Sequence, residues 1–237
     1  MKPESKLEIL KKIYNFYDNY VKKFVFICQP GCHACCTQNV LITSLEALYI
    51  ILHLENQKIL ENIKPIQKGL RPHYTTNELA YYCLKKKDVS EEEETYPQLP
   101  CSFLVEGKCL IYSLRPFSCR SFFSQERCDL VGEAVVPPEL LTVNLIIMQI
   151  LEHLDDSGCY GNMNDVISFL KDKTNLETYL KGKKLSLTEG LLPNRPIPGF
   201  LYPPEHRKEV ANILKQLKEI RAFDPTSLPP LVIPRIF

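Results

Sequence analysis

"FICQPGCHACC", residues 26–36, is the stretch of this 237-residue chain from which the fold is best predicted. Its cysteines are Cys28, Cys32, Cys35 and Cys36, and a second group follows as Cys101, Cys109, Cys119 and Cys128. Short spacings such as Cys32-x2-Cys35 let one turn of backbone present two sulfurs to one ion. The two groups of four therefore predict metal binding by thiolates.

The start of the chain decides between metal thiolates and disulfides. Residues 1–20 contain charges throughout and lack the apolar segment and cleavage site of a secretory signal. The longest apolar run, residues 140–151, is far shorter than the ~20 residues of a membrane helix. We therefore expect a soluble, cytoplasmic protein with no membrane partner and with reduced cysteines, and we disfavour a disulfide-rich secreted protein.

Charge limits the class of partner. The 29 Lys and Arg residues nearly balance the 28 Asp and Glu residues, which leaves a net charge of +1. The basic surface that nucleic-acid binding needs is not expected, so we predict no nucleic-acid partner. The expected partner is a metal ion or cluster, and a protein partner is left open.

Helical signals dominate the rest of the chain. Three pairs have the spacing of a capping box before an apolar run: Ser5 and Glu8, Thr43 and Glu46, and Thr75 and Glu78. Residues 139–154 are apolar on nearly every side, which predicts a buried helix. Asn164 and the Thr174/Glu177 pair predict two short helices, and one more is expected at about 205–221, after a proline-rich stretch.

A small hairpin is expected within the second cysteine group. "SFLV" (102–105) and "CLIY" (109–112) are β-prone and are separated by a turn at 106–108. The predicted fold class is mainly α, a helical domain with a small irregular cysteine-rich metal-binding core that contains this hairpin. We expect residues 1–130 to hold the N-terminal helix and the metal-binding domain (core 24–130). Residues 131–237 are expected to form a helical extension packed on it, with a proline-rich loop and a tail.

The arrangement of ligands has two alternatives. The side chains of adjacent residues such as Cys35 and Cys36 tend to diverge, so one of them can serve a second metal. Either each sequence group forms its own site, or the sites interleave, which we favour. Four thiolates around Zn²⁺ or a [4Fe–4S]²⁺ cluster leave a net charge of about −2. Arg115 and Arg120, on either side of Cys119, are therefore candidate cofactor-binding residues, with two exposed arginines as the equally weighted alternative.

The pattern "CxxxCxxCC" followed by "PCxFLxxGxCxIYxxRPxxCRxF" resembles the YkgJ-type cysteine-cluster proteins, a zinc- or iron-chelating CxxCxxCC family. The resemblance covers residues 24–130 and no counterpart is known to us for the C-terminal hundred residues. It implies that all eight grouped cysteines are ligands, with Arg115, Pro116 and Arg120 as family-typical neighbours. The family is described as iron–sulfur oxidoreductase-like without a settled reaction, and its domain is similar to part of flagellin lysine N-methylase.

The count and spacing of the cysteines fit zinc and iron–sulfur equally, because both accept shells of four thiolates. The family description favours an iron–sulfur cluster (4Fe–4S) over zinc. His33 can replace a thiolate in a zinc shell, but we expect it to be a bystander. Cys83 is expected to be a buried thiol and Cys159 a loop thiol, both outside the ligand set.

Three functions follow from these predictions. The first is a redox or electron-transfer step supported by an iron–sulfur cluster. The second is a protein-interaction module stabilised by zinc or iron, and the third is a part of, or accessory to, a protein lysine N-methylase-like transferase. A radical S-adenosylmethionine enzyme shares the spacing of Cys28, Cys32 and Cys35, but the chain lacks the βα units of such a barrel. A cysteine nucleophile is disfavoured because no single cysteine stands apart with a histidine, and whether the protein is an enzyme is left open.

Overall fold

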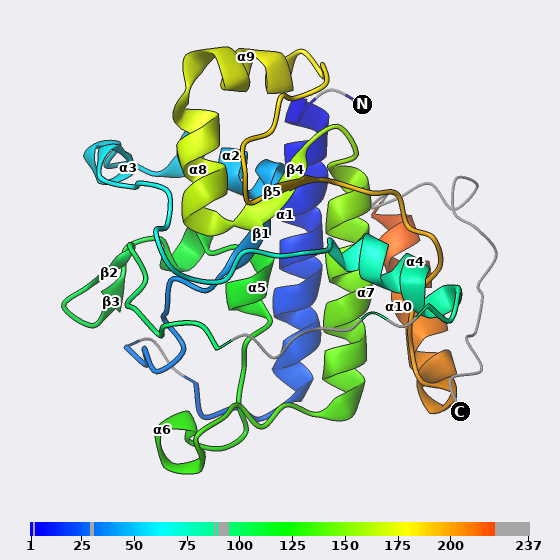
Figure 1. Cartoon of the computed structure of the whole chain (residues 1–237). Helices are drawn as coiled ribbons and strands as arrows, with labels where there is room; N and C mark the ends of the chain where they lie inside the picture. The colour runs from blue at the N-terminus through cyan, green and yellow to red at the C-terminus, as the bar shows by residue number, and fades with distance from the viewer. Residues whose placement is uncertain (2, 29–30, 88, 90–94, 221–237) are drawn as a thin grey trace.

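Two long helices, α1 (Pro3–Tyr20) and α7 (Pro138–Leu154), lie side by side at the centre of the molecule (Figure 1). The structure is a computed structural model that describes residues 1, 3–28, 31–87, 89 and 95–220. The apolar residues of α1 recur at helical spacing and are buried, and α7 is buried on most of its sides. Both helices confirm the sequence prediction, although α1 begins at Pro3, so Ser5 lies inside the helix and the capping box predicted for Ser5 and Glu8 is wrong.

Shorter helices surround this pair. They are α2 (Ser44–His53), α3 (Lys58–Glu61), α4 (Thr76–Leu84), α5 (Phe117–Arg120), α6 (Cys128–Val131), α8 (Met163–Lys171), α9 (Lys173–Leu180) and α10 (Arg207–Glu219). Three 3₁₀ turns complete the helical part: η1 (Val21–Lys23), η2 (Tyr112–Leu114) and η3 (Pro204–His206). Helix α2 packs on α1 and α8, whereas α4 and α10 pack on α7. The mainly α class is therefore confirmed.

The caps confirm part of the local prediction. Thr43 and Glu46 form the complete capping box of α2, and the Thr75 hydroxyl accepts from the backbone N–H of Glu78 in α4. The caps of α8 and α9 were predicted two residues too late: they are Asn162 and Asp172. Their side-chain oxygens accept backbone N–H groups of the first turn, in which the predicted cap residues already lie.

A three-stranded antiparallel sheet was not predicted. Its order is β1 (Leu41–Thr43), β4 (Cys159–Asn162) and β5 (Leu191–Pro193), and Thr43 pairs with Tyr160. Strands of three or four residues are too short to show the alternation that identifies a strand. Cys159, expected in a loop, is fully buried in β4. Cys83, expected to be buried, is exposed because only Asn77 and Ala80 form the buried face of α4.

The predicted hairpin is present but shorter than expected, and Lys108, predicted in the turn, lies in its second strand. Strand β2 (Leu104–Val105) pairs antiparallel with β3 (Lys108–Cys109), away from the helical core in Figure 1. The turn residues Glu106 and Gly107 have φ values of 50° and 73°, as a two-residue type I′ turn requires. The hairpin thus places Cys109 at the end of a short, twisted ribbon.

Both halves of the chain contribute to one hydrophobic core. Strand β1 pairs with β4, and helices α1 and α2 pack on α7 and α8. The helix expected at about 205–221 is α10, whereas the tail expected to pack on the helices lies outside the described residues. In the part of the chain that the structure describes, no helix is both long enough and apolar enough to cross a membrane.

Candidate metal centre

The two cysteine groups meet through paired backbones. The N–H of Cys101 donates to the carbonyl oxygen of Cys36 at 3.0 Å, and the N–H of Gln38 donates to the carbonyl oxygen of Leu99 at 2.8 Å. An antiparallel bridge between residues 37 and 100 lies between these two bonds. Cys36 and Cys101 therefore lie next to each other, although they are far apart in the sequence.

Cys28 contacts another part of the second group. The N–H of Ile27 donates to the carbonyl oxygen of Ser124 at 3.0 Å, and the N–H of Ser124 donates to the Sγ of Cys28 at 3.3 Å. The rings of Phe26 and Phe123 stack with their centroids 4.7 Å apart. This contact holds Cys28 against the segment between the third and fourth cysteines of the second group.

Backbone N–H groups also point at the sulfurs near the hairpin. The N–H of Phe103 lies 3.5 Å from the Sγ of Cys101, and the N–H of Ile111 donates to the thiol of Cys109. The sulfurs of Cys28, Cys101 and Cys109 thus accept backbone hydrogen bonds. Such bonds to sulfur are a usual outer layer of metal–thiolate sites.

A buried carboxylate fixes the helix that contains Cys119. The N–H of Phe117, at the start of α5, donates to the carboxylate of Glu46 at 2.7 Å. The hydroxyl of Ser118 donates to the carbonyl oxygen of Leu41 at 2.6 Å. Cys119 is therefore attached to the rigid junction of β1 and α2 and not to a free loop.

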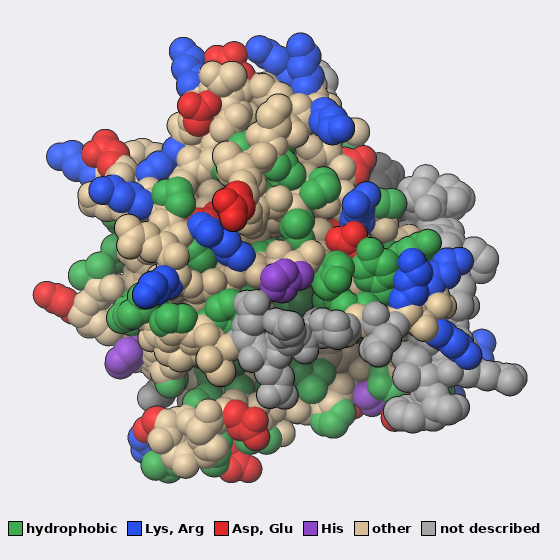
Figure 2. Space-filling model, viewed as in Figure 1, with side chains coloured by type: hydrophobic (Ala, Val, Ile, Leu, Met, Phe, Trp, Pro, Cys, Tyr) green, Lys and Arg blue, Asp and Glu red, His purple; other side chains and the backbone are tan. Residues whose placement is uncertain are grey.

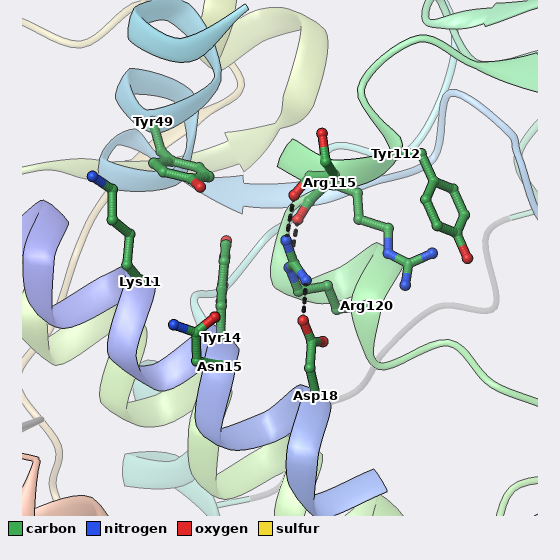
Figure 3. Close-up of a pocket in the computed structure, with 9 residues that line it drawn as sticks. Lys11, Tyr14, Asn15, Asp18, Tyr49, Tyr112, Arg115 and Arg120 are labelled. Carbon is green, nitrogen blue, oxygen red and sulfur yellow. Dashed lines mark hydrogen bonds and ion pairs between the residues drawn. The ribbon is translucent and has the colours of Figure 1, made fainter. Parts of the chain in front are cut away.

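Arg120 is buried, so the alternative of an exposed arginine is wrong for this residue. It is 6% exposed, and its guanidinium lies 4.3 Å from the ring centroid of Tyr14. It donates to Asp18 at 2.7 Å and to the carbonyl oxygens of Ser113 and Arg115 at 2.7 and 3.0 Å (Figure 3). These oxygen partners indicate that Arg120 holds the turn that leads into α5.

Arg115 lies closer to the thiols. Its guanidinium stacks 4.0 Å from the ring centroid of Tyr112, and its charge acts on the thiols of Cys35, Cys109 and Cys119. Its buried Nε has no hydrogen-bond partner among the described residues. A half-buried cation of this kind is suited to compensating a nearby negative charge.

The charge interactions divide the eight thiols into two neighbourhoods. The first contains Cys28, Cys32, Cys35 and Cys128, and the second contains Cys36, Cys101, Cys109 and Cys119. Cys35 belongs to both, because it also shares a hydrogen bond with Cys36 and acts on the thiol of Cys119. Each neighbourhood combines cysteines from both sequence groups, and the arrangement of ligands around a metal stays a prediction.

Local environment makes most of these thiols hard to ionise. Burial raises the pKa of the thiols of Cys28, Cys101, Cys109 and Cys119. The hydrogen bond with Cys36, followed by burial, raises the pKa of Cys35, and the same bond lowers the pKa of Cys36. Thiolates in such surroundings need a bound cation to be stable.

The donor set fits a soft metal, but the described side chains do not form a closed shell. All ten cysteines are free thiols, and no group of three or more His, Cys, Asp or Glu residues among the described ones is arranged to hold a metal ion. His33 is exposed, and its Nδ1 lies 3.2 Å from the carbonyl oxygen of Gly31. Thiols with N–H···S bonds and a neighbouring guanidinium are suited to zinc or iron–sulfur.

Sequence analysis missed the residues that support the cysteines from a distance. Glu46 was identified only as half of a capping box, and Asp18 and Tyr14 only as parts of a helix. Their contacts with α5 join residues far apart in the chain, for which a single sequence contains no local signal.

Comparison with protein-family models, with curated proteins and with solved structures finds no match to this chain. The resemblance to the YkgJ-type proteins therefore stays a prediction.

Proposed function

We propose that the eight grouped cysteines bind metal in two interleaved sets of four thiolates. One set is Cys28, Cys32, Cys35 and Cys128, and the other is Cys36, Cys101, Cys109 and Cys119. The observation that supports the proposal most is the convergence of two cysteine groups from distant parts of the sequence, joined by backbone bonds such as that from Cys101 to Cys36. No disulfide consumes any of the thiols.

The electrostatics around the cysteines support an anionic centre. Two sets of four thiolates carry more negative charge than their metals neutralise. Arg115 supplies a positive charge with no carboxylate partner among the described residues, and several of the sulfurs accept N–H bonds. The positive charge and the N–H donors stabilise thiolates more than they stabilise neutral thiols.

Of the two metals, we propose an iron–sulfur cluster that supports a redox or electron-transfer step. The resemblance to iron–sulfur oxidoreductase-like proteins favours it over zinc. Such a cluster supplies one-electron chemistry, with a potential set by its hydrogen bonds and its exposure. A role beside a protein lysine N-methylase rests on the resemblance alone, and binding of S-adenosylmethionine in a thermal-shift titration tests it.

A second candidate is a protein-interaction module in which the metal is structural. Large apolar side chains around the cysteines are exposed, among them Val25 at 84%, Leu130 at 74% and Phe122 at 49%. Figure 2 shows hydrophobic side chains at the surface near the hairpin. Exposed apolar patches of this kind favour a protein partner, which either function accommodates.

Metal and sulfide analysis of the full chain after anaerobic purification tests the proposal. We expect bound iron, acid-labile sulfide and an absorption band at about 400 nm. Cys36→Ser and Cys128→Ser, one from each set, should each lower the metal content by about half. Cys83→Ser, an exposed cysteine in α4, is the matched control and should leave it unchanged.

The outcomes separate the two candidates. Zinc in place of iron, with unchanged stoichiometry, supports the interaction module and argues against redox chemistry. A metal-free protein, or a loss in Cys83→Ser equal to that in Cys36→Ser, overturns metal binding by these cysteines. Loss of all metal in both ligand variants shows that the eight thiols form one centre and not two.

A further inference from the structure

A pocket of about 510 Å³ lies beside the cysteines, between α1, α2 and the turn that leads into α5. Figure 3 shows Arg120 in the middle, with Tyr14 and Tyr49 on one side and Arg115 and Tyr112 on the other. We propose that this pocket binds a small organic anion, a carboxylate or a phosphate ester attached to a flat ring. The proposal goes beyond metal binding and does not depend on it.

The charges of the lining favour an anion. Within the lining, three cationic side chains, Lys11, Arg115 and Arg120, face one carboxylate, Asp18. Arg115 also acts on the thiols of Cys35, Cys109 and Cys119, so its charge is shared with the proposed metal centre, and Lys11 supplies the positive charge that belongs to the pocket alone. Asp18 is already paired with Arg120 at 2.7 Å. Outside the lining, Glu8 lies 3.0 Å from the Lys11 ammonium but is exposed, so solvent screens that pair.

Hydrogen-bond donors remain for a ligand. A guanidinium has five N–H donors, and three of those of Arg120 have acceptors among the described residues. The Nε of Arg115 also has no acceptor in the same part of the chain, but it is buried, so the remaining N–H groups of Arg120 are the donors offered to a ligand. Carboxylates and phosphates bind arginine through several short bonds at once, which is the recognition that these free donors suit.

The aromatic lining adds selectivity for a ring. Tyr14 and Tyr49 are arranged edge to face, with centroids 6.0 Å apart, and Tyr112 lies across the pocket. Such rings stack on flat ligands. The volume is in the usual range for sites of small molecules, about 300–1,000 Å³.

Calorimetric titration of the purified full chain tests the proposal. The probes are benzoate and phenyl phosphate, compared with inorganic phosphate and with benzylamine. We expect one or both ring-bearing anions to bind at least about 10-fold more tightly than inorganic phosphate, and benzylamine not to bind. The preferred probe distinguishes a carboxylate ligand from a phosphate ester.

Two variants locate the binding. Lys11→Gln removes one cation from the rim and should weaken both anions about 3- to 10-fold. Tyr49→Leu should weaken the ring-bearing probes by a similar factor and leave inorganic phosphate unchanged. Lys12→Gln, the exposed neighbour on α1 outside the lining, is the matched control and should change nothing.

Binding of benzylamine as tight as that of benzoate overturns the proposal, as does equal binding by Lys11→Gln and Lys12→Gln. Absence of binding below about 10 mM for every probe also overturns it. Metal content is measured on the same samples. Anion binding by a metal-free protein contradicts only the metal proposal, and a metal-loaded protein that binds no anion contradicts only this one.

Discussion

Glu46 joins three parts of the molecule through one buried carboxylate. It is 4% exposed and accepts from the hydroxyl of Tyr14 at 2.9 Å, from the N–H of Phe117 at 2.7 Å and from the N–H of Thr43 at 2.9 Å. The donors come from α1, from α5 and from the start of α2. Both carboxylate oxygens of Glu46 accept hydrogen bonds, so a neutral amide of the same shape cannot accept all of them.

Replacing Glu46 by Gln should lower the free energy of unfolding by about 2–4 kcal/mol, because the amide N–H₂ then faces N–H or O–H donors inside the protein. Urea unfolding followed by circular dichroism measures the change. Glu8→Gln, at an exposed position on α1, should stay within about 0.5 kcal/mol of the wild type. Equal stabilities of the two variants would show that the network around Glu46 is dispensable.

Asp155 predicts a pH dependence. Burial raises the pKa of this carboxyl from 3.8 to about 6, against the hydrogen bonds from Ser44 and Tyr179 that lower it. Between pH 4 and pH 6 the folded protein then binds more protons at this site than the unfolded chain does. Asp155 should therefore contribute a fall in stability as the pH rises through that range, on the order of 2–3 kcal/mol.

Chemical denaturation at a series of pH values measures this contribution. The comparison is with Asp155→Asn, which does not titrate and should lack this part of the slope, whatever its overall stability. Parallel pH profiles for the two proteins would contradict the raised pKa.

At the scale of elements, the turn of the hairpin that contains Cys109 has a backbone conformation that most residues adopt only with strain. Glu106 has a φ of 50°, a left-handed conformation that favours Gly or Asn, and Gly107 has a φ of 73°. Gly107→Ala should therefore destabilise the protein by about 1 kcal/mol, and Glu106→Asn should stabilise it by a few tenths to about 1 kcal/mol. The midpoints of urea unfolding measure both, and effects of the same sign would argue against the type I′ turn.

The elements also show which structure is predictable from one sequence. The capping box at Thr43, the Gly107 turn and the apolar run of α7 are signals within a few residues of one another, and each was found. Strand β4 is stable only because β1 and β5 pair with it, and a four-residue run such as "CYGN" has no pattern of its own. The error at Cys83 has the same origin, because which side of α4 is buried depends on α7.

In the candidate site, too, the local features were predictable from the sequence and the contacts between distant residues were not. The spacing of the cysteines predicted the eight candidate ligands, because two sulfurs on one turn is a local feature. The roles of Arg120 and of Asp18 were beyond prediction, since their 2.7 Å contact joins α1 to α5 across about a hundred residues. Burial of a charged pair is decided by packing, which the sequence around each residue does not contain.

At the scale of the whole molecule, the cysteine loops lie at the edge of the helical core. The buried apolar residues come mainly from α1, α2, α7, α8 and α10, whereas six of the eight grouped cysteines are half-buried and two are exposed. The loops at residues 24–28 and 31–38 contain no helix or strand, and residues 99–131 contain only the hairpin, η2 and the short helices α5 and α6. A bound metal should therefore stabilise these loops more than it stabilises the core.

Removal of metal with a chelator should raise amide hydrogen exchange in those loops and leave the central helices α1, α7 and α8 protected. Mass spectrometry of peptic fragments measures the change, with Cys36→Ser as the control in which one set is already missing. A uniform rise over all helices would show that the core depends on the metal. Unchanged exchange everywhere would show that no metal was bound.

The pairing of β1 with β4 has a consequence for the protein as it is made. Both cysteine groups emerge from the ribosome before α7, β4 and α8 emerge, and until then β1 lacks its neighbour and α1 lacks much of its apolar cover. The nascent chain thus offers its thiols to solvent before the scaffold that orients them exists. During this part of synthesis, metal ions and oxidants in the cell compete for the same sulfur atoms.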